Sequence, residues 1–381
     1  MPAFVSSIGL RVSKLRIDWL LFFSAVVLVS FGLVTMNSFT SDNHYFDRQI
    51  VWLAVAVCVF FISSAIDWSF LKRTNVLVTL FVGLIVLLGG LLGLATAVKG
   101  ARSWIDLGFF SFQPTDIAKL LLVLILAKYF SRRHIEIANI RHIIVSGIYA
   151  FILFALVALQ PDFGGAIVIA LVWLGMTLVS GISKKHLLAL FFVAAAVFSV
   201  LWGYGFKEYQ KARILTFLHP LADVRGAGYN AYQSTIAVGS GEILGKGIGY
   251  GTQSKLKFLP EYETDFIFAA FAEEWGFVGV TMLIFAFGLL IFRILVAARN
   301  GATNFEILYC LGLAILFMSH FVINVGMNMG LLPVTGLTLP FVSYGGSHLV
   351  TSFLALGILV SMRRYERTVH KDETGKEFVG I

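Results

Sequence analysis

Apolar residues run along the chain in ten stretches of about 18 residues or more, separated by shorter polar segments. A helix of that length spans a hydrocarbon core of about 30 Å. The stretches lack the alternating apolar pattern of a membrane β-barrel. The pattern therefore predicts an all-α polytopic membrane protein with ten transmembrane helices. The expected ranges are 18–37, 48–66, 75–97, 113–130, 142–159, 163–181, 187–205, 265–296, 305–329 and 343–362.

The distribution of Lys and Arg predicts the orientation of these helices. With both termini on the inner side, the inner segments hold 18 Lys and Arg residues and the short outer loops hold 3. We therefore expect cytoplasmic termini and a large extracellular loop, about 206–264, between helices 7 and 8. Residues 1–381 are expected to form a single transmembrane domain with a disordered cytoplasmic tail at about 364–381.

Composition agrees with this class, because 58% of the residues are apolar and only 13% are charged. The net charge of +8 follows mostly from the topological bias of Lys and Arg, so it argues against a nucleic-acid partner. Cys58 and Cys310 both fall in apolar stretches. The sequence therefore shows neither a disulfide framework nor a metal-ligand spacing.

Charged residues in or beside a membrane helix are costly and mark candidate sites. The fourth stretch opens with Gln113 and Pro114, and Asp116 and Lys119 follow at i, i+3 on one helix face. They form either an ion pair that neutralises itself or a polar wall that orients an anionic substrate. In "ALQPDFGGA", Asp162 either caps the sixth helix or is a carboxylate that faces a cavity and pairs with Lys119.

The loop 206–264 is rich in glycine but also contains apolar residues, as in "STIAVGSGEILG". A flexible linker lacks such residues, so we expect an ordered lid on the outer side. Its cations, Lys246 and Lys255 among them, either bind an anion or are solvated surface charges.

Two further stretches carry polar groups at helix ends. In "FLPEYETDFIFAAFAEEWG", Asp265 stands where a carboxylate caps a helix, and at least one of Glu273 and Glu274 must face a partner or a cavity rather than lipid. In "LLPVTGLTLPFVSYGGSHLV", prolines and glycines break the backbone before Ser343 and Ser347. Broken backbone at membrane depth requires protein or a water-filled cavity around it. We expect His348 to be a packed residue rather than a ligand.

Five segments together resemble the SEDS family of cell-wall polymerases, which includes FtsW, RodA and SpoVE. They are "GARSWIDLGFFSFQPTDIAK", "QPDFG", "GKGIGYGTQSKLKFLPEYETDFIFA", "AEEWGFVG" and "NMGLLPVTGLTLPFVSYGGS". Within the family, "GTQSKLKFLPE" and "LLPVTGLTLP" are more similar to the RodA branch, which serves elongation, than to FtsW, which serves division.

The resemblance implies a peptidoglycan glycosyltransferase that polymerises lipid II, with Asp265, the Asp of "TDFIF", as the catalytic carboxylate. A displacement that inverts the sugar carbon needs one base, and a leaving pyrophosphate needs positive charge. Among the cations, Arg102 and Lys119 suit the pyrophosphate best by family position. The substrate-binding residues implied are Lys99, Arg102, Asp116, Lys119, Asp162, Lys246, Lys255, Ser343 and Ser347.

The sequence departs from the usual family pattern at three places. Asp116 stands in "QPTD" where "QPSE" is common, Glu263 replaces the usual His before "TDFIF", and His348 stands where a second Ser is common. The first change weakens any geometric claim about Asp116, and the second puts in doubt any role of the missing His. None of them removes Asp265.

The family also implies partners and a compartment. These are lipid II and the undecaprenyl-linked glycan, a class B penicillin-binding protein transpeptidase, other proteins of the elongation complex, and the bacterial cytoplasmic membrane. A divalent cation, Mg²⁺ or Mn²⁺, is compatible with the pyrophosphate chemistry, although no ligand pattern requires one. Two other functions fit ten helices with polar groups inside: a lipid II flippase, and a non-catalytic scaffold in which Asp265 is only a helix cap.

Overall fold

The computed structural model describes residues 17–38, 44–94, 104–106, 108, 111–132, 140–206, 208–219 and 228–376. Within them each of the ten predicted ranges contains a helix, which confirms the all-α polytopic class. Eight of the described helices are long and apolar enough to cross a membrane. The other two are α6 (Phe163–Val179), which is apolar but shorter, and α4 (Pro114–Ser131), which carries three charged residues. The number of ten spans therefore stays a prediction.

The remaining long helices follow the predicted ranges within a few residues, except that α13 runs further. They are α1 (Trp19–Asn37), α2 (His44–Ala65), α3 (Thr74–Leu94), α5 (Ile140–Leu159), α7 (Lys184–Val200), α11 (Ile267–Arg299), α12 (Asn304–Asn328) and α13 (Gly346–Lys376). A 3₁₀ helix, η1 (Trp68–Lys72), joins α2 to α3, and a π-helical turn, η2 (Leu201–Gly205), follows α7.

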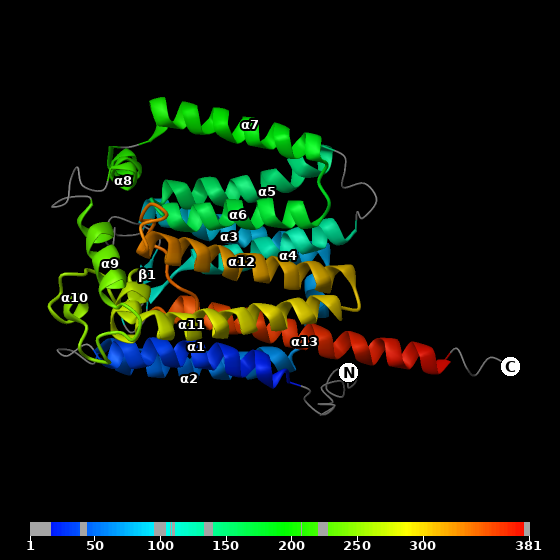
Figure 1. Cartoon of the computed structure of the whole chain (residues 1–381). Helices are drawn as coiled ribbons and strands as arrows, with labels where there is room; N and C mark the ends of the chain where they lie inside the picture. The colour runs from blue at the N-terminus through cyan, green and yellow to red at the C-terminus, as the bar shows by residue number, and fades with distance from the viewer. Residues whose placement is uncertain are drawn as a thin grey trace.

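Figure 1 shows the long helices lying side by side. α1, α2, α11 and α13 lie along one side, α12, α4 and α6 follow, and α7 lies at the opposite edge. No residue of α7 is buried. α1 begins and α13 ends at the same end of the bundle, and the other end carries the short helices α8 (Glu208–Leu218), α9 (Tyr229–Ser240) and α10 (Thr252–Lys255).

Small residues bring the main helices close together. A Cβ atom added at Gly357 of α13 would overlap the Ser63 hydroxyl of α2, and one at Gly32 of α1 would overlap the Val342 carbonyl. Such contacts favour association of membrane helices, because lipid competes with apolar side chains but not with close backbone packing. The bundle thereby holds α2 and α13 in its most extensive helix pair.

The described parts of the loop 206–264 are ordered, as the composition predicts. Helix α9 packs on both α11 and α12 and buries Ser234 and Ala237. A Cβ at Gly241 would overlap the Ala272 carbonyl of α11, so the small residues of this segment permit close contact. We call residues 228–264 the lid.

A two-stranded hairpin leads into α4. Strand β1 (Ile105–Asp106) pairs antiparallel with β2 (Ser111–Phe112), and Pro114 occupies the first turn of α4, as predicted. The predicted substrate-binding residues Lys99 and Arg102 lie outside the described residues.

One expectation about a helix end is wrong, and one helix runs further than predicted. Asp265 does not cap the eighth long helix, because Phe266 is the N-cap of α11; the first turn is bound by Asn328, whose Oδ1 accepts from Ala269 N–H at 3.2 Å. The backbone of residues 261–266 instead folds into a turn in which Phe266 N–H donates to the Glu261 carbonyl. Helix α13 continues to Lys376, beyond the predicted end of the tenth helix, and the expectation of a disordered tail stays a prediction. Arg, Lys and Glu are good helix formers, and a helix already formed in the bundle propagates into them without a new nucleus.

Candidate active site

The segment 331–345 crosses the lid end of the bundle between α12 and α13 and is fixed by asparagine side chains. Asn324 Nδ2 donates to the carbonyls of Leu337, at 2.6 Å, and of Asp265, at 2.9 Å. Asn328 Nδ2 donates to the same Asp265 carbonyl at 3.1 Å. Two buried amides on α12 therefore hold the backbone of Asp265 next to this segment.

Ser343 joins the same two segments from the other side. Its hydroxyl donates to the Thr264 carbonyl at 2.6 Å and accepts from Leu339 N–H at 2.8 Å. A Cβ built at Gly336, whose φ is +75°, would lie 3.5 Å from Asp265 Oδ2. The half-buried Asp265 carboxylate therefore faces the backbone of Gly336, where the absence of a side chain leaves room beside it.

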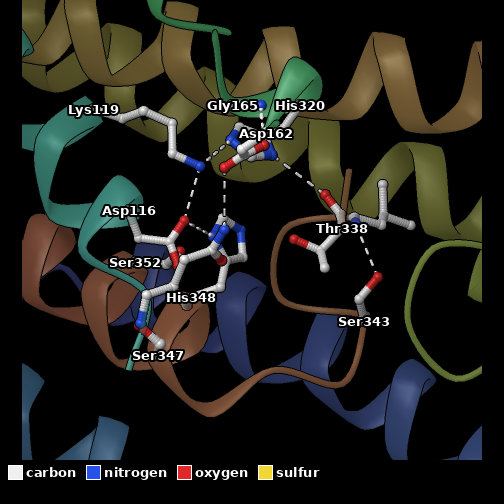
Figure 2. Close-up of polar contacts among 12 residues, drawn as sticks. Asp116, Lys119, Asp162, Gly165, His320, Thr338, Ser343, Ser347, His348 and Ser352 are labelled. Carbon is white, nitrogen blue, oxygen red and sulfur yellow. Dashed lines mark hydrogen bonds and ion pairs between the residues drawn. The ribbon is translucent and has the colours of Figure 1, made fainter. Parts of the chain in front are cut away.

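A buried charge cluster lies between α4, α12 and α13, as Figure 2 shows. Lys119 Nζ lies 2.8 Å from Asp116 Oδ1, so the predicted pair at i, i+3 is confirmed. His348 Nδ1 lies 3.2 Å from the same oxygen, and Lys119 also reaches His320 Nε2 at 3.2 Å. We call these four residues the α4 cluster.

Donor chemistry assigns the tautomers in this cluster. An ammonium group can only donate, so His320 Nε2 accepts from Lys119. The other ring nitrogen of His320 then carries the proton and donates to the Thr338 carbonyl at 3.3 Å. Since Thr338 follows the segment that Asn324 holds, the cluster and Asp265 are linked through residues 336–338.

Two atoms of the α4 cluster have no hydrogen-bond partner among the described residues, namely Asp116 Oδ2 and His348 Nε2. A cavity of about 20 Å³ lies beside them, with Thr351 and Ser352 also in its wall. That volume is sufficient for about one water molecule. Most of the cavity wall is apolar, so such a water would have the two unpaired atoms as its polar partners. The cluster is thus open on one side rather than internally complete.

Asp162 lies at the edge of the cluster and caps α6, as predicted, by accepting from Gly165 N–H at 2.8 Å. Its Oδ2 accepts from Gln113 Nε2 at 3.3 Å, and Gln113 N–H donates to Ser347 Oγ at 3.1 Å. Burial raises the pKa of the Asp162 carboxyl, although the charge of Lys119 and the Gly165 N–H act in the opposite direction. Lys119 forms its ion pair with Asp116 and not with Asp162.

The two glutamates of α11 face the lid rather than lipid. Glu273 Oε1 accepts from Lys246 Nζ at 2.7 Å and from Thr252 N–H at 2.9 Å, and both its oxygens accept from Gln253 N–H. Glu274 Oε1 accepts from Gly249 N–H at 3.1 Å and from the Ser38 hydroxyl at 2.5 Å. The lid between residues 246 and 253 is therefore fastened to α11 by two buried carboxylates.

The predicted substrate-binding residues are thus distributed over three places. Asp116, Lys119, Asp162 and Ser347 lie together, and Ser343 lies beside Asp265. Lys246 belongs to the lid fastening, and the exposed Lys255 donates to the Gly249 carbonyl at 3.4 Å. The substrate roles assigned to these residues stay predictions.

Sequence reasoning missed the polar face of α12, which consists of His320, Asn324 and Asn328. These residues recur at i, i+4 and i+8 in an otherwise apolar stretch, so they share one helix face. A search for all polar residues in the apolar stretches, rather than for charged ones alone, finds this face.

No group of three His, Cys, Asp or Glu residues in the described part of the chain is arranged to hold a metal ion. Asp265 is a single hard oxygen ligand. Mg²⁺ commonly binds one or two carboxylates together with substrate phosphates and water. The residues present therefore fit a cation that arrives with a phosphorylated substrate better than a resident metal.

The fold and the polar site at one end of the bundle define a multi-pass helical membrane protein. A family model described as cell cycle protein, covering FtsW, RodA and SpoVE, matches residues 12–368. This chain belongs to that family, whose members are also called SEDS proteins, and it is a peptidoglycan glycosyltransferase.

Relatives of several kinds match nearly the whole chain. Peptidoglycan glycosyltransferase MrdB of Escherichia coli K12 is 35% identical over 91% of this chain and 92% of its own length. Probable peptidoglycan glycosyltransferase FtsW of Haemophilus influenzae is 34% identical over 92% of this chain and 91% of its own. Stage V sporulation protein E of Bacillus subtilis is 33% identical over 92% and 98%, respectively.

Solved structures agree with these relatives. A chain from a peptidoglycan synthase complex that coordinates polymerization and crosslinking has a TM-score of 0.79 and 32% identity. The rod shape determining protein RodA of Thermus thermophilus has a TM-score of 0.69 and 29% identity. In each comparison the match covers 92% of this chain and 98% of the other.

Proposed function

We propose that this protein polymerises lipid II into glycan strands at the outer face of the bacterial cytoplasmic membrane. The 4-hydroxyl of the GlcNAc of one lipid II attacks C1 of the MurNAc at the reducing end of the growing chain. A C1–O bond forms to the attacking oxygen while the bond from C1 to the diphosphate oxygen breaks. Undecaprenyl pyrophosphate leaves with the electron pair, and the Asp265 carboxylate takes the hydroxyl proton.

The position of Asp265 carries this proposal. Its backbone is held by Asn324 and Asn328, and its carboxylate faces the backbone of Gly336 at the lid end of the bundle. A base held in this way is positioned before the substrate arrives, which favours proton transfer. A single displacement inverts C1 and needs this one carboxylate as a base, with no second carboxylate as nucleophile.

A role in elongation is the finer part of the proposal. RodA-type and MrdB-type proteins are among the similar proteins, and "GTQSKLKFLPE" favours that branch. FtsW and stage V sporulation protein E match almost as well, so division and sporulation are the alternatives that a complementation experiment must separate. Rod shape restored in cells lacking their elongation polymerase supports the elongation role, and rescue of division alone contradicts it.

We also propose a class B penicillin-binding protein transpeptidase as partner, which the similarity to a chain of a peptidoglycan synthase complex supports. The excess of positive residues in the inner segments supports cytoplasmic termini. A divalent cation bound with the diphosphate would neutralise charge on the leaving group, and Asp265 is the carboxylate within this site that could share it.

The test is polymerisation of labelled lipid II by the purified protein with its transpeptidase partner, read on gels. Asp265→Asn keeps the size of the side chain and removes the base, so we expect glycan polymer from the wild type and none from this variant. Glu242→Gln is the matched control, since it neutralises an exposed carboxylate of the lid, and it should polymerise normally. Equal polymer from wild type and Asp265→Asn would contradict the role of Asp265, and no polymer from either would favour a flippase or a scaffold.

A further inference from the structure

A cavity of about 280 Å³ lies between α8, α9 and the turn that follows α12. Its volume is near the lower end of the range of about 300 to 1,000 Å³ that is typical of small-molecule pockets. Two kinds of side chain line it. Arg213, Thr216 and Tyr232 provide a cation and hydroxyl groups, and Phe217, Leu332 and Val334 provide apolar wall.

Arg213 differs from Lys119 and Lys246 in that the described part of the chain offers it no bonding partner. Among the described residues it forms neither an ion pair nor a hydrogen bond, and its guanidinium is exposed. Lys119 and Lys246, in contrast, are each bound to a buried carboxylate at 2.8 Å and 2.7 Å. A free guanidinium presents paired N–H donors that fit two phosphate oxygens at once.

The cavity adjoins Asp265 through a few residues. Val334 in its wall is two residues from Gly336, at most about 7 Å of chain, and the Gly336 position faces the Asp265 carboxylate. On the α9 side, Ser234 Oγ donates to the carbonyl of Asn328, whose amide holds Asp265. In a displacement, a base lies within about 3 Å of the attacking oxygen, which lies about 3 Å from C1. The Val334 wall of the cavity is thus at most about 12 Å from the Asp265 carboxylate, which leaves room for the attacking oxygen, C1 and the leaving oxygen between them.

The preceding segment indicates the level of the membrane surface. Trp202 and the exposed Tyr204 lie in η2, at the end of α7, immediately before α8. Aromatic residues of this kind are enriched where the hydrocarbon meets the head groups. A cavity formed by α8 at this level can receive both a polar head group and the first part of its lipid chain.

We propose that this cavity binds the diphosphate and the first isoprenoid units of a polyprenyl-diphosphate-linked sugar, with Arg213 on the diphosphate and Phe217, Leu332 and Val334 on the isoprenoid. This inference rests on the proposed function and adds the place of the leaving group. Thr216 and Tyr232 supply hydroxyl donors for the remaining phosphate oxygens.

The experiment measures binding of farnesyl diphosphate to the purified full-length protein by isothermal titration calorimetry. Wild type binds, and Arg213→Gln weakens binding about tenfold to hundredfold, the loss expected when a charge-assisted hydrogen bond is removed. Arg213→Lys lies between them, because a lysine keeps the charge without the fork. Lys211→Gln is the control on the same helix, where Lys211 pairs with Glu208 at 3.6 Å, and it binds as wild type does.

Two fragments test both halves of the cavity. Inorganic pyrophosphate and farnesol should each bind at least about tenfold more weakly than farnesyl diphosphate, because each uses only one kind of wall. Equal binding of farnesyl diphosphate by wild type and Arg213→Gln overturns the assignment. Inorganic pyrophosphate that binds as tightly as farnesyl diphosphate also overturns it, since it indicates a surface anion site.

The binding measurement separates this inference from the proposed function, because it needs no turnover. A wild type that binds farnesyl diphosphate but makes no glycan contradicts the polymerase and leaves the cavity assignment standing. A wild type that polymerises lipid II but binds no farnesyl diphosphate overturns the cavity assignment alone. Melting temperatures of all variants show that each is folded when it is measured.

Discussion

Two buried carboxylates in this protein are each paired with a lysine, and they differ in how completely their oxygens are bound. Glu273 pairs with Lys246 at 2.7 Å, and both its oxygens accept further hydrogen bonds from the lid. Asp116 pairs with Lys119 at 2.8 Å, but both of its contacts fall on Oδ1 and leave Oδ2 without a partner. Both carboxylates are almost inaccessible to solvent.

This difference separates a carboxylate whose two oxygens are both bound by the protein from one that has an oxygen left over. A buried carboxylate with every lone pair engaged resists change and fixes its neighbours, whereas an unpaired buried oxygen costs stability unless something else binds it. Glu273 therefore holds the lid in place, whereas the α4 cluster keeps a polar oxygen that a water molecule in the adjoining cavity can bind. Variants in the two regions should change different measurements.

The largest expected effect is on stability, in Glu273→Ala. Removing this carboxylate leaves two lid N–H groups without their acceptor, at about 1–3 kcal/mol each, and the partly exposed Lys246 without its partner. Thermal unfolding in detergent measures the loss. Glu208→Ala is the control, because Glu208 is 93% exposed in its pair with Lys211, and such a pair contributes less than about 1 kcal/mol. Equal melting temperatures for the two variants would show that Glu273 does not hold the lid.

Gly276→Ala tests the same contact without changing any charge. Gly276 has φ of +63°, and a Cβ there would overlap Gly245 N of the lid, so we expect a loss of about 2–3 kcal/mol from backbone strain and separation of the two segments. Gly239→Ala in α9 is the matched control, since nothing lies within 4 Å of its Cβ position. Alanine is the better helix former, so this control should be neutral or slightly stabilising in the same unfolding assay.

Asp116→Asn should affect the rate of polymerisation more than stability. The amide oxygen still accepts from Lys119, but the charge that holds Lys119 and His348 is gone, and loss of one charge-assisted bond corresponds to about tenfold to hundredfold in rate. Polymer formed per folded molecule, measured over time, tests this. Asp67→Asn, which retains the cap of η1, should match the wild type. A large drop in melting temperature with a normal rate of polymerisation would show that Asp116, like Glu273, stabilises the fold and does not support the reaction.

The smallest effect is expected for Asp162→Asn, which should change how the melting temperature depends on pH. The pKa of Asp162 is raised by burial, so the folded state favours the protonated carboxyl, and ionisation destabilises it as pH rises through that pKa. Asparagine is an equally good cap and stays neutral. The variant should therefore melt slightly higher than wild type near pH 8 and no higher near pH 4. A gain that is the same at both pH values would rule out ionisation as its cause.

Sequence patterns predicted the helices well because a membrane-spanning helix needs a long apolar run, and each such run contains a helix. The Asp162 cap and the Asp116–Lys119 pair were also predictable, since both depend on residues within four positions of one another. The Asp265 cap failed for a nonlocal reason. Asn324 and Asn328, about sixty residues further along the chain, bind its carbonyl and favour a turn over a first helical residue.

The remaining site features depend on contacts that no local pattern specifies. Whether Lys119 pairs with Asp116 alone or also reaches His320, 201 residues away, is decided by how α4 packs on α12. The hydrogen-bond partners of Glu273 are likewise determined by the lid. The lid backbone between Lys246 and Gln253 depends on glycines with positive φ and on close contacts with α11.

Helix α11 is kinked at Gly276. Its φ of +63° and ψ of −166° interrupt the helical backbone. Residues 267–275 therefore form a short helical segment that is separate from the longer segment 277–299. Glu273 and Glu274 lie in this short segment and bind the lid. Asp265 lies just before the N-terminus of the same segment. Beyond Gly276, Phe277 and Val278 N–H donate to the lid carbonyls of Glu242 and Ile243, so the lid binds α11 on both sides of the kink and fixes the angle at which the segment next to Asp265 leaves the membrane helix.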